Sequence, residues 1–269
     1  MSCTVEIICI GNELLIGKIL NTNAQWLAKR ITSLGGKVKR IYTVEDDLDE
    51  VSSTLNESLL RTPTFIITTG GLGPTFDDKT LEAIAKALNK RLVLNEEAFN
   101  MIKEKYRQYE TSILKKIELT PARVKMAILP RLAKPIKNPV GTAPAVLIKF
   151  KSSKIITLPG VPTELEAIFN ESIAPMIKRA TKGLVLYEKS LNITAIIESE
   201  LAPLLDEVMH DNPYVYLKSH PKAAEPIPKI ELHMMTTAKS KEDAKIRVET
   251  VAEQISKRIS EHGGVVLAI

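Results

Sequence analysis

The sequence contains few aromatic residues and few cysteines. Aromatic side chains make up 4% of its 269 residues, and Trp26 is the single tryptophan. Proteins that hold single-stranded nucleic acid stack its bases on aromatic side chains, so this composition argues against that class. Cys3 and Cys9 lie in one predicted strand at a separation of about 20 Å, which is too far for a disulfide between them. Two free cysteines are typical of the reducing cytoplasm.

Long apolar segments are also missing. The chain shows no charged segment followed by an apolar one at its start, and no apolar run reaches the length that spans a bilayer. We therefore expect a soluble cytoplasmic protein without a membrane partner. The formal net charge is +5 and the pI is near 9.0, but the basic residues are scattered along the chain. Scattered positive charge fits a small anionic ligand and gives no support to nucleic-acid binding.

The first part of the chain alternates short apolar runs with amphipathic segments. The apolar runs predict three buried strands, at 5–10, 38–44 and 65–69. Apolar residues at helical spacing predict three helices, at 24–34, 48–59 and 81–88. Strands that alternate with helices form a parallel sheet with helices on both faces. The sequence therefore predicts a three-layer, doubly wound α/β domain with a mostly parallel sheet.

The later part of this domain carries less regular signals. Asn95 is predicted to cap a helix, and a hairpin is predicted with strands at 145–150 and 154–158. Thr163 and Glu166 have the spacing of a capping box at the start of the next helix. From about residue 183 the pattern restarts.

The last part of the chain shows the order strand, helix, strand, strand, helix, strand. This is the split βαβ arrangement of ferredoxin-like α+β domains. We place a boundary within 179–183, which gives a first domain at 1–180 and a smaller second domain at 184–269.

Acidic residues follow each of the three predicted parallel strands. Glu13 follows the first strand, Asp46 follows the second, and Asp77 and Asp78 follow the third. In open parallel sheets, ligands bind at the carboxyl ends of the strands. We therefore expect these carboxylates to converge on one site.

The loop after the third strand combines glycines with these acids. Gly70, Gly71 and Gly73 expose backbone amides ahead of a helix start, where an anion such as phosphate binds. Asp77 and Asp78 would repel that anion unless a cation lies between them, and Mg²⁺ prefers one or two carboxylates together with phosphate oxygens. Two alternatives need no ligand: either aspartate could cap the helix, and the glycines could simply form a tight turn.

Two further motifs are open to the same pair of interpretations. In "NPVGTAP", Gly141 and Thr142 could contact a phosphate, or the segment could be a plain turn. In "LPGVP", Gly160 precedes a helix start that could bind a second anion, or it could form a tight strand-to-helix turn.

Four motifs in order resemble one known family. "GNELLIGKILNTNAQWLAKRI", "TTGGLGPTFDDKTLEAIAKAL", "NPVGTAPA" and "LPGVPTELEAIF" are similar to the N-terminal domain of CinA (competence/damage-inducible) proteins. That domain belongs to the molybdopterin-binding superfamily that includes MogA, MoaB, gephyrin and MoeA. Full-length CinA proteins carry a further C-terminal domain linked to nicotinamide-nucleotide deamidation, which this sequence lacks, so the resemblance does not imply that activity.

The resemblance implies a function and a set of site residues. It implies metal-dependent hydrolysis of ADP-ribose, or a related dinucleotide, to AMP and a sugar phosphate. The expected metal is Mg²⁺, or else Mn²⁺ or Co²⁺, bound by Asp46, Asp77 and Asp78, with Asp46 and Asp78 catalytic. The expected substrate and phosphate contacts are Asn12, Glu13, Thr69, Gly70, Gly71, Gly73, Thr80, Gly141, Thr142 and Gly160.

Two other functions remain open on the same residues. The first is molybdopterin binding in molybdenum cofactor biosynthesis, because the relatives bind a pterin phosphate. The second is a non-catalytic module that binds a nucleotide or pterin. The resemblance also implies self-association, and edge strands of such sheets are commonly covered by a partner, so we expect a homo-oligomer.

Overall fold

The chain divides into two units in a computed structural model. The structure describes residues 3–114, 116–222 and 229–268. The first unit comprises Met1–Thr32 and Gly36–Thr181, and the second comprises Ser33–Gly35 and Lys182–Ile269.

A six-stranded sheet forms the centre of the first unit. Its order is β2-β1-β3-β8-β7-β6, with β1 at Thr4–Ile10, β2 at Lys37–Val44, β3 at Phe65–Thr69, β6 at Lys134–Ile136, β7 at Ala145–Phe150 and β8 at Ser153–Leu158. The strands β2, β1, β3 and β8 are parallel, while β7 and β6 are antiparallel additions. Every residue of β3 is buried, as expected for a parallel strand covered on both faces.

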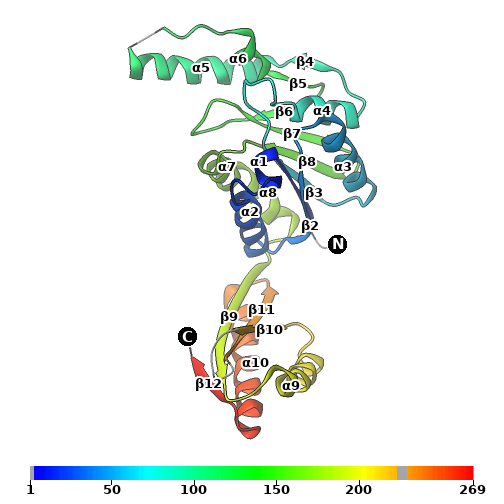
Figure 1. Cartoon of the computed structure of the whole chain (residues 1–269), viewed down its shortest axis with the longest axis vertical. Coiled ribbons are helices and arrows are strands. Elements are labelled where there is room, and N and C mark those ends of the chain that lie inside the picture. Colours follow the sequence, from blue (N-terminus) through cyan, green and yellow to red (C-terminus); the bar gives the residue numbers. More distant parts are fainter. Residues whose placement is uncertain (1–2, 115, 223–228, 269) are drawn as a thin grey trace. The chain divides into compact units, whose positions relative to one another are not determined.

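Helices cover both faces of this sheet, as Figure 1 shows. On one side lie α2 (Thr22–Ser33), α7 (Pro162–Ile168) and α8 (Ala174–Ala180). On the other side lie α3 (Leu48–Leu60) and α4 (Thr80–Ala87). The predicted three-layer α/β fold is therefore confirmed.

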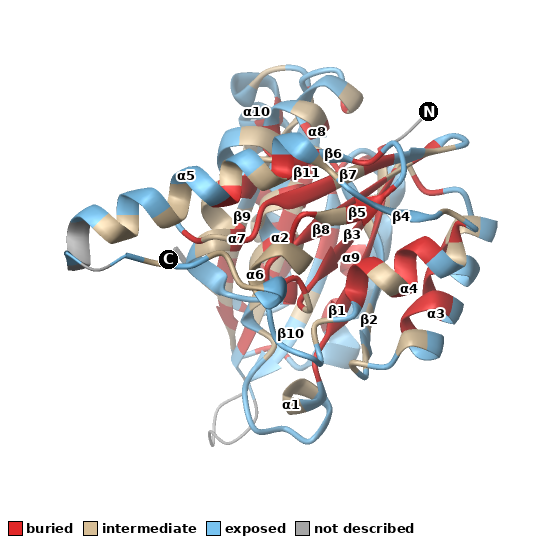
Figure 2. Cartoon of the chain, turned by 90° about the horizontal axis from the view of Figure 1, so that it is seen from above, coloured by how far each residue is buried: buried red, intermediate tan, exposed pale blue. Residues whose placement is uncertain are grey.

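The hydrophobic core on the second side joins strands to helices. Ile8 and Ile66 of the sheet pack with Leu55 of α3 and Ile84 of α4, and all four are fully buried. Figure 2 shows that buried residues are concentrated in the central strands β1, β3 and β8. These strands end at one edge of the sheet, so a well-packed core supports the loops that leave them.

The remaining elements of the first unit are short or peripheral. These are α1 (Asn12–Leu15), α5 (Glu96–Ile113), α6 (Pro121–Lys125), a π-helical turn at Phe169–Ile173, and an antiparallel ribbon of β4 (Leu92–Leu94) with β5 (Ile128–Pro130). The three-residue strands β4, β5 and β6 were not predicted, because three residues are too few to show a periodicity.

Two of the local cap predictions have opposite outcomes. Asn95 does cap α5, since its side chain accepts a hydrogen bond from the Ala98 amide at 2.9 Å. The capping box at Thr163 and Glu166 is wrong. Helix α7 begins one residue earlier, at Pro162, with Val161 as its N-cap and no side-chain cap, so Thr163 already lies inside the first turn.

The second unit has the predicted order of elements. It contains β9 (Val185–Thr194), α9 (Glu198–Asp211), β10 (Tyr216–Lys222), β11 (Lys229–Ala238), α10 (Lys241–Glu261) and β12 (Val265–Ala268). The strands pair antiparallel in the order β10-β11-β9-β12. Its core packs Leu232 and Met234 of the sheet with Leu205 of α9 and Val251 of α10. This is the ferredoxin-like α+β arrangement expected from the sequence.

Cys3 and Cys9 are both free, as their spacing predicted, and both are buried. No helix among the described residues is long and apolar enough to cross a membrane.

Candidate functional site

A pocket of about 490 Å³ lies at the carboxyl ends of the central strands. Ile10, Gly70 and Pro159, which end or follow β1, β3 and β8, contribute to its walls. Five carboxylates line it, namely Glu13, Asp46, Asp77, Asp78 and Glu164. Among the described residues that line this pocket there is no lysine, arginine or histidine. The convergence of acids from three strand ends, expected from the sequence, is therefore present.

Asp46 is held in this pocket by a reciprocal pair of hydrogen bonds with Asn12. Its Oδ2 accepts a hydrogen bond from the Asn12 amide at 2.9 Å, and its own amide donates to Asn12 Oδ1 at 3.4 Å. Burial raises the pKa of Asp46 above its ordinary value, and the negative charges of Glu13, Asp77 and Asp78 raise it further, against the hydrogen bond from Asn12. The pKa of Asp46 therefore depends on acidic side chains from the loops after β1 and β3.

The glycine loop after β3 is shaped by close contacts that only glycine permits. Gly70 has φ of +107°, and a Cβ there would lie 2.3 Å from the Ile10 carbonyl oxygen. A Cβ on Gly71 would lie 2.2 Å from Thr80 Oγ1, and one on Gly73 would lie 2.6 Å from Asp78 Oδ2. The Gly70 amide donates to the Leu158 carbonyl at 3.1 Å, so it continues the sheet and is not available for a ligand.

Asp77 and Asp78 both accept hydrogen bonds from Thr75. The Thr75 hydroxyl lies 2.5 Å from Asp77 Oδ1 and 2.5 Å from Asp78 Oδ2, and the Thr75 amide donates to Asp78 Oδ2 at 2.8 Å. The hydrogen bond from this hydroxyl is the main reason that the pKa of Asp77 is lowered. Neither aspartate caps α4, because that helix begins at Thr80 with Lys79 as its N-cap and no side-chain cap. The capping interpretation of these acids is therefore wrong.

Three of the predicted contact residues position the site and do not line its main pocket. Thr80 is 2% exposed and donates to the Gly70 carbonyl at 2.9 Å. Thr69 donates to the Pro159 carbonyl at 3.1 Å and accepts from Asn23 Nδ2 at 3.2 Å. Asn12 orients Asp46, as described above. These three side chains hold the loops in place through hydrogen bonds.

The remaining predicted residues line two different hollows of the first unit. Thr142 and Gly160 line the main pocket. Gly141 lines a different surface hollow, between the 137–144 loop and α5. The backbone of Gly141 packs against the carboxylate of Glu164. A Cβ on Gly141 would lie 2.1 Å from Glu164 Cδ.

Sequence reasoning missed several residues of the pocket. Tyr106 of α5, Met126, Ala143 and Glu164 all line it. Tyr106 and Met126 lie outside the four sequence motifs that pointed to the site. The "PGVPTE" motif contained Glu164, but the residue was not singled out, since a carboxylate in the first turn of a helix is usually explained by the helix dipole.

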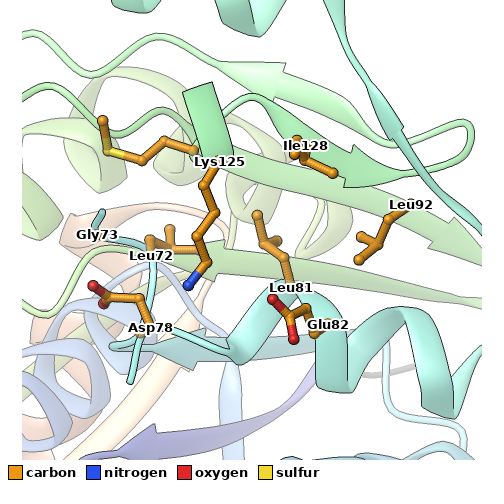
Figure 3. Close-up of a pocket in the computed structure, with 10 residues that line it drawn as sticks. Leu72, Gly73, Asp78, Leu81, Glu82, Leu92, Lys125 and Ile128 are labelled. Carbon is orange, nitrogen blue, oxygen red and sulfur yellow. The ribbon is translucent and has the colours of Figure 1, made fainter. Parts of the chain in front are cut away.

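Lys125 is a further residue near the site that sequence reasoning missed. It extends from α6 toward the loop with Leu72, Gly73 and Asp78, as Figure 3 shows. These residues line a smaller pocket of about 130 Å³. Lys125 Nζ donates to the Thr75 carbonyl at 2.9 Å, and its charge contributes to the lowered pKa of Asp77. Lys125 therefore stabilises the loop that carries both aspartates.

The carboxylates of the pocket are spread over its walls. In the part of the chain that the structure describes, no three His, Cys, Asp or Glu side chains group closely enough to hold a metal ion by themselves. The donor set is still one of hard oxygens, which suits Mg²⁺ when a ligand phosphate and water complete the coordination.

Comparisons with known proteins place the chain in a family. The family model described as "Probable molybdopterin binding domain" matches residues 6–179. A protein of Caldivirga maquilingensis is 45% identical over 254 residues, which are 94% of this chain and 95% of the relative. A protein of Pyrobaculum arsenaticum is 41% identical over 259 residues, which are 96% of this chain and 95% of the relative.

A solved structure supports the same assignment. The protein CinA with unknown function from Thermoplasma acidophilum is 40% identical, with a TM-score of 0.58. The match covers 65% of this chain and 98% of that protein. The resemblance to CinA proteins is thus confirmed, and the chain belongs to the molybdopterin-binding domain family.

Proposed function

We propose that the chain binds a phosphorylated pterin or nucleotide in the main pocket, with a divalent cation between the phosphate and Asp46, Asp77 and Asp78. The observation that carries this proposal is the composition of the pocket, in which a glycine loop at the strand ends faces several carboxylates and no basic side chain lines the described wall. A phosphate there would meet an excess of negative charge that Lys125, outside the main pocket, offsets only in part, and a bound cation would neutralise the rest. The family match supports a pterin more than it supports ADP-ribose.

The concentration of negative charge in the pocket supports a cation. Asp77 and Asp78 lie close enough to contact the same hydroxyl, that of Thr75. Burial raises the pKa of Asp46, and the negative charges of Glu13, Asp77 and Asp78 raise it further. A cation bound among these carboxylates would offset their mutual repulsion.

A second function, hydrolysis of a phosphate anhydride such as that of ADP-ribose, would use the same pocket and the same carboxylates. Asp46 and Asp78 would hold a divalent ion, which would polarise a phosphoryl oxygen and lower the pKa of a water molecule. Lys125 and Thr80 would keep the glycine loop in place during this step.

Binding of GMP and AMP by calorimetry tests the first function. We expect binding in the presence of Mg²⁺ and affinity at least about tenfold lower in EDTA, since a charge pair in a partly buried site is lost. Equal affinity in both conditions would remove the cation from the proposal. If neither nucleotide binds, the phosphate site itself is overturned.

A substrate panel tests the second function. ADP-ribose, NAD, FAD and ATP would each be incubated with Mg²⁺, Mn²⁺ or Co²⁺, and released AMP or phosphate would be measured. Release of AMP from ADP-ribose that disappears in Asp46→Asn supports hydrolysis. Binding without turnover leaves the protein as a binding module.

A further inference from the structure

We infer that Glu164 selects the ring of the ligand, by accepting hydrogen bonds from the paired N–H groups on the amino-oxo edge of a pterin or guanine. This inference rests on the proposed function, because the phosphate end of the pocket is assumed to hold the other end of the same ligand. It adds a specificity that the phosphate end lacks, since phosphate is common to all nucleotides.

Glu164 is fixed by a buried polar residue. It lies in the first turn of α7, is half-buried and lines the main pocket. Its Oε2 accepts a hydrogen bond from Asn138 Nδ2 at 2.6 Å. Asn138 is 6% exposed. It also donates to the Ala143 carbonyl at 2.9 Å and accepts from the amides of Val140 and Gly141, at 3.0 and 2.8 Å.

The 137–144 loop is built around this carboxylate. A Cβ on Gly141 would lie 2.1 Å from Glu164 Cδ and Oε2 and 2.4 Å from Oε1, so the whole carboxylate lies flat against the Gly141 backbone. A phosphate at Gly141 and Thr142, the alternative considered from the sequence, would therefore meet a negative charge. This end of the pocket suits a ligand group that donates hydrogen bonds.

The free oxygen of Glu164 sets the kind of donor. Among the described residues, Oε1 accepts no hydrogen bond and Oε2 accepts one from Asn138. Each carboxylate oxygen has about two acceptor positions, so both oxygens can still accept from a ligand. The amino-oxo edge of a pterin or guanine presents a ring N–H next to an amino group, two donors side by side. Adenine presents its amino group between ring nitrogens that are acceptors, which a carboxylate repels. Glu164 therefore favours a pterin or guanine over adenine.

Neighbouring side chains suit the flat faces of such a ring. Tyr106, Met126, Leu72 and Ala143 line the same pocket and offer aromatic and apolar surface. The guanidinium of Arg123 lies 4.7 Å from the centroid of the Tyr106 ring, and this contact holds the ring in its orientation. A polar edge at Glu164 with apolar faces beside it is the usual composition of a ligand pocket.

The test compares GMP with AMP in the presence of Mg²⁺, because the two share their ribose phosphate and differ at the ring edge. We expect wild-type protein to bind GMP at least about tenfold more tightly than AMP, since a site built to receive hydrogen bonds rejects an analogue that lacks the donors. Glu164→Gln keeps the size of the side chain and an acceptor for Asn138. It should weaken GMP binding at least about tenfold and should not weaken AMP binding, because adenine is no longer repelled by the carboxylate.

A matched control and a second probe complete the experiment. Glu166→Gln changes a glutamate on the same helix that does not line the pocket, and it should keep the wild-type preference for GMP. Neopterin, a pterin without phosphate, should compete with GMP for wild-type protein and not for Glu164→Gln. Melting curves check that both variants are folded, and the wild-type preference itself tests the inference if a variant does not fold.

The outcomes separate the two proposals. Equal affinity of wild-type protein for GMP and AMP, or equal loss of both in Glu164→Gln, overturns the role of Glu164 and leaves the phosphate site in place. Failure of both nucleotides to bind wild-type protein overturns the proposed function, and this inference with it.

Discussion

Two loops of the first unit carry adjacent aspartates before a helix, and the structure uses them differently. After β2, Asp47 caps α3, with its Oδ1 accepting from the amides of Asp49 and Glu50 at 2.8 and 3.0 Å. Its neighbour Asp46 lines the pocket. After β3, neither Asp77 nor Asp78 caps α4, and both bind Thr75.

The difference teaches that a carboxylate a few residues before a helix can either cap the helix or face a ligand, depending on the residue at which the helix begins. A cap requires the acid to be the residue directly before the first turn. Asp47 occupies that position before Leu48, whereas Lys79 occupies it before Thr80. The acids that are not at the cap position are free to face a ligand.

The largest effect on stability should come from a substitution of Gly70, in the loop after β3. Gly70→Ala should lower the unfolding free energy by about 3 kcal/mol, because an alanine is strained at φ of +107° and its Cβ overlaps the Ile10 carbonyl. Gly17→Ala is the control, since Gly17 also has positive φ but nothing within 4 Å, and it should cost about 1 kcal/mol. Urea unfolding followed by the fluorescence of Trp26, which lies in the first unit, measures both. Equal losses would contradict the close contact at Gly70.

The next effect separates the two aspartates of the first loop. Asp46→Asn should weaken Mg²⁺-dependent GMP binding by about a hundredfold, because the variant keeps an acceptor for the Asn12 amide but loses the charge that the cation needs. Asp47→Asn should leave binding unchanged, because asparagine caps a helix as well as aspartate does. Calorimetric titration measures both affinities. A comparable loss in Asp47→Asn would assign the effect to general charge and not to the pocket.

A smaller effect should appear in the pH dependence of stability without metal. The pKa of Asp46 is raised in the folded state. The wild-type protein therefore loses stability as the pH rises from below the unfolded-state pKa through the folded-state pKa. Asp46→Asn does not titrate there, so it should be more stable than wild type at pH 7, and this gain should vanish at acidic pH. Denaturant midpoints between pH 4 and pH 7 measure the difference. A constant difference over this range would show that burial and the neighbouring acids do not raise the pKa of Asp46 in the folded protein.

The smallest effect concerns the cap itself. Asp47→Ala should lower the melting temperature modestly, because two amides of α3 lose their acceptor. Asp77→Ala should not have this effect, because its carboxylate accepts no hydrogen bond from α4. Thermal unfolding monitored by circular dichroism compares them. A larger loss in Asp77→Ala would show that the second loop, and not the cap, limits stability.

Much of the fold follows from local sequence patterns. Apolar runs as in β1 and β3, and one-sided apolar spacing as in α3 and α4, identify strands and helices because burial requires these periods. The carboxylates of Asp46, Asp77 and Asp78 could be assigned to one site because the ends of parallel strands meet at one edge of a sheet. The residues Tyr106, Met126 and Lys125 could not be assigned to it, because the α5–α6 region reaches the pocket only through tertiary packing.

By itself the sequence determined the order of the longer strands and helices and the edge of the sheet at which the acids gather, since these depend on periodicities within short segments. The tertiary structure decided which aspartate caps a helix and which faces the pocket, because that depends on the residue at which each helix begins. It also decided that Glu164 lies against Gly141, more than twenty positions earlier in the chain. Contacts between residues so far apart depend on how the whole sheet and its helices pack, which no local pattern encodes.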